Sequence, residues 1–256
     1  MISIAEIDAR SFRGRAEDQP AGAVIPPHRH RGAQLLFASS GVLRVEAARS
    51  HWVVPPNRAV WLPPGETHTV RMGGAVTMRT LYLSRDVTMK VPRWAECHVI
   101  AVSALLRALI LDLVEGGHGP ERRRAVLALL LDELHYADHL PLQLPMPVEP
   151  RLQRLCRALA AKPQDERDFE AWAAACGASA RTLARLFRRE TGLSFRVWRQ
   201  QVRLIAALER LSAGESVGRV SAALGYRSAS AFTAMFRRAL GRPPQDFLRD
   251  RDAVQG

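Results

Sequence analysis

The C-terminal half of the chain contains the same local pattern twice, and this repeat restricts what that half can fold into. In each copy a serine precedes a stretch with apolar residues at helical spacing, two adjacent arginines close the stretch, and a glycine follows. The copies run from Ser179 to Gly192 and from Ser228 to Gly241. Serine is a favourable helix N-cap, and glycine readily ends a helix because it adopts the left-handed conformation. Each copy therefore predicts a helix with one apolar face, entered from a tight turn, as in a helix-turn-helix motif.

The face of each predicted helix opposite its apolar residues carries short polar and basic side chains, which suit a helix that reads the DNA major groove. Another helix, predicted over residues 194–211, connects the two motifs. At about 1.5 Å per residue it can hold them roughly one DNA turn apart, so that both enter successive major grooves. The predicted DNA-contacting residues are Ala180, Arg181, Ala184, Arg185, Arg188, Arg189, Arg227, Ser228, Ser230, Thr233, Arg237 and Arg238.

Within this set, Arg181 and Arg185 are predicted to contact bases, because one arginine can form two hydrogen bonds to a guanine. The second helix has small side chains, which favour docking or contacts with thymine methyl groups. Arginines at the helix ends, such as Arg188 and Arg237, are better placed for phosphates. The alternative is that they are solvated side chains that interact favourably with the helix dipole.

Basic residues are concentrated in the same half of the chain. The whole chain has 37 Lys and Arg against 25 Asp and Glu, a net charge of +12. Residues 1–148 hold 17 basic and 14 acidic residues, whereas residues 149–256 hold 20 and 11. A cationic half beside a nearly neutral half indicates a nucleic-acid-binding module joined to a domain of another kind.

The length of 256 residues suits two domains, each large enough to bury a core. The three cysteines are odd in number and widely spaced, which indicates free thiols in a reducing compartment. The sequence has no apolar run long enough to span a bilayer and no recognisable export signal. We therefore expect a cytoplasmic protein without a membrane partner.

Residues 1–95 have the character of an all-β domain, because short runs rich in β-branched and aromatic residues alternate with Gly, Pro and Asn. This pattern predicts an antiparallel β-barrel. Residues 96–140 change to helical spacing and predict a hairpin of two leucine-rich helices, which closes the barrel, mediates dimerisation or does both. Residues 141–150 contain four prolines and predict a semi-rigid linker before an all-α DNA-binding domain at 151–256. The expected class is thus α+β with two domains.

The barrel segment also contains a group of candidate ligands. His28, His30 and Gln34 have even numbers, so on one continuous strand they would point to the same face, and His68 could join them from a neighbouring strand. Three imidazoles and an amide oxygen can bind a divalent transition metal (Ni, Zn, Mn or Fe) and leave positions open for water or an effector. The alternatives are a metal-free pocket for a small organic effector, or histidines that only satisfy buried backbone groups. The predicted effector-binding residues are His28, His30, Gln34, Trp61 and His68.

This part of the chain resembles the paired motifs of the cupin superfamily. The matching residues are Gly22, His28, His30, Gly41, Pro63, Gly65 and His68. The chain departs from the cupin pattern where Gln34 stands in the usual glutamate position, where Asn57 replaces a glycine and where Met72 replaces an asparagine. The resemblance implies a cupin barrel with a ligand or metal site.

Residues 168–248 resemble the DNA-binding domain of the AraC/XylS family of bacterial transcription factors. The matching residues are Ser179, Leu183, Arg185, Phe187, Gly192, Trp198, Ala206, Leu211, Val217, Gly225, Tyr226, Ser230, Phe232, Phe236, Gly241 and Pro243. The resemblance implies a homodimeric regulator that binds a double-stranded DNA operator, senses a small molecule through its cupin domain and, as an activator, contacts RNA polymerase. The competing interpretation is a metal-dependent cupin enzyme, a dioxygenase or isomerase, with an accessory DNA-binding domain.

Overall fold

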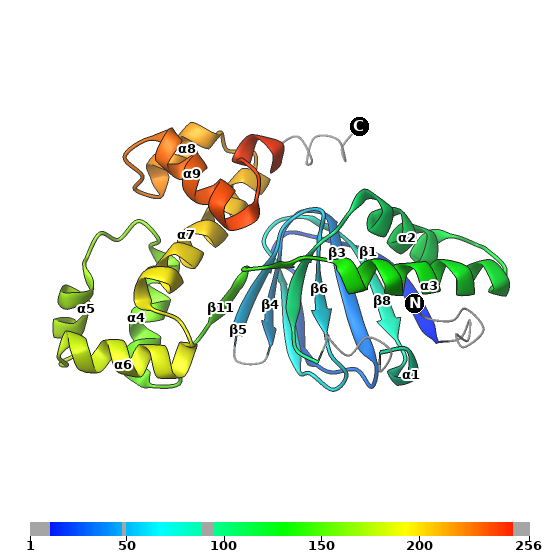
Figure 1. The fold of residues 1–256 in the computed structure, drawn as a ribbon, viewed down its shortest axis with the longest axis horizontal. Coiled ribbons are helices and arrows are strands. Elements are labelled where there is room, and N and C mark those ends of the chain that lie inside the picture. The colour runs from blue at the N-terminus through cyan, green and yellow to red at the C-terminus, as the bar shows by residue number, and fades with distance from the viewer. Residues whose placement is uncertain (1–10, 48–49, 89–94, 248–256) are drawn as a thin grey trace. The chain divides into compact units, whose positions relative to one another are not determined.

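The computed structural model describes residues 11–47, 50–88 and 95–247 (Figure 1). Within these residues the chain divides into two compact units. One unit contains most of the chain before residue 141, and the other contains residues 141–247 together with 50–51. The first unit is built on antiparallel strands and the second is helical, which confirms the predicted α+β class with a β domain before a helix-turn-helix domain.

The strands form two sheets. The six-stranded sheet has the order β1–β8–β3–β6–β9–β10 and consists of β1 (Phe12–Gln19), β3 (Ala33–Ser40), β6 (Arg58–Leu62), β8 (Val76–Leu83), β9 (His98–Ala101) and β10 (His139–Leu140). The five-stranded sheet has the order β11–β5–β4–β7–β2 and consists of β2 (Val24–His28), β4 (Leu43–Ala47), β5 (Ser50–Val54), β7 (His68–Met72) and β11 (Gln143–Pro145). The apolar runs near residues 34–37, 42–45, 52–54, 59–61 and 78–82 correspond to β3, β4, β5, β6 and β8. β1, β9, β10 and β11 were not predicted; the last three are at most four residues long and lie in segments expected to be helical or linker.

Two helices, α2 (Ala104–Glu115) and α3 (Pro120–Tyr136), form the predicted hairpin and cover one face of the six-stranded sheet (Figure 1). Ser103 caps α2 by accepting a hydrogen bond from the main-chain nitrogen of Leu106. The leucines of the predicted stripe that are buried in this core are Leu109, Leu113, Leu130 and Leu134. Most of the stripe therefore packs against the sheet, which is the first of the two roles expected for it, whereas Leu105 at the start of the stripe is 45% exposed. A single helical turn, α1 (Arg85–Thr88), follows β8.

The second unit contains six helices among its described residues: α4 (Pro150–Ala161), α5 (Phe169–Ala175), α6 (Ala180–Thr191), α7 (Phe195–Ser212), α8 (Val217–Ala223) and α9 (Ala229–Leu240). The pairs α5–α6 and α8–α9 are the two predicted helix-turn-helix motifs, and α7 connects them (Figure 1). Ser179 and Ser228 cap α6 and α9 as predicted. Gly192 and Gly241 end the same helices with φ angles of 73° and 76°, a conformation that strains other residues.

The segment predicted to be a linker is partly folded onto this helical unit. Leu144 is only 4% exposed and packs in the core with residues of α4, α5, α6 and α7. The indole Nε1 of Trp198 donates a hydrogen bond to the main-chain oxygen of Pro145 at 2.8 Å. Prolines exclude helix from this segment, as expected, but its apolar residues complete the core of the second unit. The freely exposed linker is therefore shorter than residues 141–150.

Cys97, Cys156 and Cys176 are all free thiols, as the sequence predicted. Among the described residues, no helix is both long enough and apolar enough to cross a membrane.

Candidate effector site and DNA interface

Three histidines come together between the ends of two neighbouring strands. His28 is the last residue of β2, His68 is the first residue of β7, and the two are direct partners in this antiparallel pair. His30 follows β2 in the turn that leads to β3. The ring centroid of His28 lies 4.2 Å from that of His68 and 4.9 Å from that of His30, and the His30–His68 separation is 5.6 Å. The three predicted histidines therefore form one cluster.

The hydrogen bonds of these rings leave ligand nitrogens available. Nδ1 of His28 lies 2.8 Å from the carbonyl oxygen of Pro26, and Nδ1 of His68 lies 3.0 Å from that of Glu66. Because a carbonyl oxygen can only accept, Nδ1 carries the proton in both rings, and the lone pair lies on Nε2. Nε2 of His30 and Nε2 of His68 are buried without a hydrogen-bond partner among the described residues. One ligand nitrogen from each ring can be chosen such that all three lie within 4.8 Å of one another.

Burial lowers the pKa of two of these imidazoles, His30 and His68, and so favours their neutral form. Desolvation is the main reason that the pKa of His68 falls to about 4, with smaller contributions from His28 and His30, while its bond to the Glu66 carbonyl acts in the opposite direction. Desolvation also lowers the pKa of His30, and His28 adds to this effect. A neutral imidazole is the form that ligates a metal or accepts a hydrogen bond from a ligand.

The fourth predicted ligand approaches from the other sheet. Gln34 lies on β3, is 4% exposed, and its Oε1 is buried without a partner among the described residues. Gln34 is the direct partner of Tyr82 on β8, so both side chains lie on the same face of the sheet. The ring of Tyr82 is 4.8 Å from that of His30. His28, His30 and Gln34 do not share one continuous strand, contrary to the prediction, because the chain turns between β2 and β3.

Trp61 is not part of this cluster. It is the strand partner of Leu35 on β3, the residue next to Gln34, and so lies on the opposite face of the sheet. Its indole is 1% exposed and packs in the core beneath α2 and α3. The prediction that Trp61 lines the effector site was therefore wrong. Tyr82 lies beside His30 instead, and only the strand register reveals this, since no motif marks Tyr82.

The predicted DNA-contacting residues lie on the two reading helices, α6 and α9, and in the turn before α9. Most are exposed, and Ala180 and Thr233 are partly exposed. On α9 the surface is hollowed by an open groove of about 680 Å³. Its lining includes Ala229, Ser230, Thr233, Ala234, Arg237 and Arg238. The lining thus combines small side chains with two arginines, which is compatible with close approach of a DNA strand.

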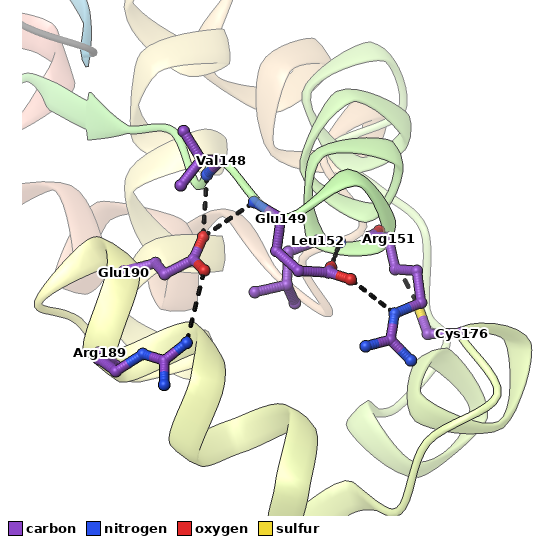
Figure 2. Close-up of polar contacts among 7 residues, drawn as sticks. All are labelled: Val148, Glu149, Arg151, Leu152, Cys176, Arg189 and Glu190. Carbon is purple, nitrogen blue, oxygen red and sulfur yellow. Dashed lines mark hydrogen bonds and ion pairs between the residues drawn. The ribbon is translucent and has the colours of Figure 1, made fainter.

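The end of the first reading helix is bonded to the chain that precedes α4 (Figure 2). The carboxylate of Glu190 on α6 accepts hydrogen bonds from the main-chain nitrogens of Val148 and Glu149, at 2.8 and 3.0 Å. Glu149 in turn caps α4 by accepting from the nitrogen of Leu152 at 2.8 Å. Glu190 could not be predicted from the sequence, because its partners are main-chain groups about forty residues away and no local pattern indicates them.

A β domain with a polar ligand cluster, followed by a domain with two helix-turn-helix motifs, defines a transcription regulator that couples a ligand-binding domain to a DNA-binding one. Residues 12–137 match the family model of the AraC-like ligand binding domain, and residues 172–250 match a helix-turn-helix domain. The chain is 35% identical over 227 residues to the HTH-type transcriptional regulator NimR of Escherichia coli (strain K12), covering 87% of this chain and 82% of that protein. The chain therefore belongs to the AraC family of transcription regulators.

The chain is also similar to other known proteins. The HTH-type transcriptional regulator RipA of Corynebacterium glutamicum is 33% identical over 112 residues, which cover 44% of this chain and 34% of RipA. Among solved structures, ToxT from Vibrio cholerae aligns over 94% of this chain and 98% of its own, with 9% identity and a TM-score of 0.40. The named relatives are regulators, so this chain is a DNA-binding regulator with a ligand-binding domain and not a cupin enzyme.

Proposed function

We propose that the histidine cluster is the effector site of this regulator and that it holds a divalent transition metal. His28, His30 and His68 would be the metal ligands, with Gln34 beside them as a weaker neutral ligand. One observation carries the proposal: a ring nitrogen from each of the three histidines lies within 4.8 Å of the other two, and Nε2 of His30 and of His68 is buried without a hydrogen-bond partner among the described residues. In His28 and His68 the other nitrogen, Nδ1, donates to a backbone carbonyl. Metal-binding histidines commonly donate their second ring nitrogen to a carbonyl in this way, since the bond fixes the ring and its tautomer.

The metal would contribute a positive charge and open coordination positions. A small effector with oxygen or nitrogen donors could bind there, oriented by Gln34 and Tyr82. Three nitrogen ligands suit Zn, Ni, Fe or Mn more than Ca or Mg, which prefer oxygen. The second candidate is a metal-free pocket, in which the same nitrogen atoms and Oε1 of Gln34 would hydrogen-bond an organic effector. The buried Oε1 of Gln34 would accept a hydrogen bond from such an effector.

Elemental analysis of untagged protein, purified without chelators, tests the proposal. The wild type is expected to carry close to one metal ion per chain, and His68→Ala is expected to lose it. His118→Ala is the matched control, because His118 lies in the turn after α2, pairs with Asp112 at 3.0 Å and is not one of the clustered histidines. If the wild type stays metal-free after reconstitution with Ni, Zn, Mn or Fe, the metal-free organic pocket is the correct alternative.

We further propose a homodimer formed through the outer face of the α2–α3 hairpin. Three large apolar side chains on this hairpin remain exposed: Leu105 at 45%, Leu129 at 43% and Tyr136 at 74%. Leu129 and Tyr136 are seven residues apart on α3 and so lie on the same side of the helix. A second copy of the chain would cover these side chains, and a dimer would bring two DNA-binding domains to one operator. As an activator, the protein would have RNA polymerase as a further partner in the bacterial cytoplasm.

A further inference from the structure

Two arginines of α7 hold the main chain of the α4–α5 loop, residues 162–168. Arg199 donates through Nη1 to the carbonyl oxygen of Arg167 at 2.9 Å, and through Nη2 to that of Asp165. Arg203 donates through Nε to the carbonyl oxygen of Pro163 at 3.1 Å. Alternate carbonyls of a loop without regular structure are thus bound to one face of the helix that connects the two DNA-binding motifs. A guanidinium group suits this task, because its donors have a fixed planar geometry.

Contacts made by Asp165 and Arg167 also constrain the conformation of this loop. The carboxylate of Asp165 accepts from Nη2 of Arg167 at 2.7 Å and from the main-chain nitrogen of Arg167 at 3.0 Å. The guanidinium of Arg167 lies 3.6 Å from the centre of the Trp172 ring, which is buried on α5. The contact between Arg167 and Trp172 therefore joins the loop to α5, the first helix of the first helix-turn-helix motif.

The α4–α5 loop also lies close to the second helix-turn-helix motif, α8–α9. Gly225, in the turn between α8 and α9, has a φ of 73°, and a Cβ placed there would lie 3.7 Å from the carbonyl oxygen of Gln164. The guanidinium of Arg203 is 5.7 Å from the centre of the Tyr226 ring. Arg203 therefore contacts both the loop and the turn from which α9 begins.

A groove of about 450 Å³ runs between the motifs at this point. Phe169 on α5 and Met235 on α9 both line it, together with Arg196, Arg199 and Arg203 of α7. Arg199 and Arg203 lie close together, and burial with the charge of Arg203 lowers the pKa of Arg199. Two neighbouring cations are unfavourable in such a place, and the negative charges of Asp165 and Glu166 offset part of this cost. The hydrogen bonds to the loop carbonyls satisfy further donors of the two guanidinium groups.

We propose that the α4–α5 loop is a strut between the two helix-turn-helix motifs, and that Arg199 and Arg203 are positioning residues that set the separation and orientation of α6 and α9. Through them, the strut determines which half-site spacing in the operator the protein accepts. The physical reason is the DNA helix: one extra base pair moves the second half-site by about 3.4 Å and rotates it by roughly 35°. A single helix can bend, whereas a connection through both α7 and the loop resists bending.

Dissociation constants are first measured for an operator that the wild-type protein selects from random DNA. They are then measured for versions with one base pair inserted or deleted between the two half-sites that α6 and α9 of one chain contact. The wild type is expected to discriminate against the altered spacings. Arg203→Ala and Arg199→Ala are expected to reduce that discrimination about fivefold to tenfold, mainly by weakening binding to the selected spacing. Arg196→Ala is the matched control, because it removes the same charge from an exposed position on α7 that lines the same groove.

Circular dichroism melting shows whether each variant is folded. If Arg199→Ala fails to fold, Arg203→Ala decides the question, since Arg203 is only partly buried and holds one loop carbonyl. The proposal is overturned if folded Arg203→Ala keeps the wild-type discrimination, or loses affinity for all spacings equally, as a loss of charge alone predicts. The proposal rests on DNA binding and not on the histidine cluster, so a metal-free result leaves it intact. A wild-type protein without any preference for spacing would refute the proposal, because α6 and α9 would then not contact DNA at a fixed separation.

Discussion

Arg185 and Arg188 lie within one turn of each other on α6, and both are exposed, yet they are expected to act differently on DNA. Arg185 is in the middle of the reading helix, where it can reach a guanine edge, whereas Arg188 is in the last turn. Arg185→Ala should remove about 1–3 kcal/mol of discrimination at one base pair. Arg188→Ala should weaken all sequences alike and reduce the salt dependence by about one phosphate contact. Fluorescence anisotropy with operator variants at several salt concentrations measures both effects. An equal loss on every sequence for Arg185→Ala would contradict the assignment to bases.

At the same scale, the histidine cluster shows how far individual residues could be predicted. Residue type and motif spacing were enough to select His28, His30 and His68. They were not enough to place Trp61 and Tyr82, because the face of a strand on which a side chain lies depends on its pairing. Trp61 pairs with Leu35 and is buried under the helices, whereas Tyr82 pairs with Gln34 and faces His30.

Among the secondary-structure elements, the packing of α2 against β1 depends on one glycine. A Cβ at Gly14 would lie 2.8 Å from both the carbonyl oxygen of Leu113 and the Cα of Val114. Both atoms belong to the backbone of α2, so the helix itself would have to move. Gly14→Ala is therefore expected to destabilise the β domain by about 1–3 kcal/mol, the usual cost of overpacking. Denaturant unfolding followed by tryptophan fluorescence measures this change.

Gly74→Ala is the control for that measurement. A Cβ at Gly74 meets nothing within 4 Å among the described residues, and its φ is not in the left-handed region. Its effect on the free energy of unfolding should be within about 0.5 kcal/mol. If the two variants were equally stable, the close contact between α2 and β1 would not be rigid.

For the whole molecule, the proposed dimer predicts that a charge on the outer face of the hairpin separates the two copies. Leu129→Glu should convert the wild-type dimer to a monomer in light scattering, because the interface would bury an unpaired carboxylate. Val197→Glu is the matched control: Val197 is 45% exposed on α7, similar to Leu129, but lies in the DNA-binding domain. A wild-type monomer, or a Leu129→Glu dimer, would contradict the proposed interface.

The sequence by itself determined the class of each domain, the two helix-turn-helix motifs with their caps, and the three histidines. These features depend on neighbouring residues: a serine caps the helix that follows it, a glycine ends the helix before it, and apolar spacing selects the buried face. The tertiary structure alone decided that Tyr82 rather than Trp61 faces the histidines, that Leu144 belongs to the core of the helical unit, and that Glu190, Arg199 and Arg203 bind distant main-chain groups. Such contacts join residues far apart in the chain, often through backbone atoms that every residue possesses. No local pattern of side chains can therefore predict them.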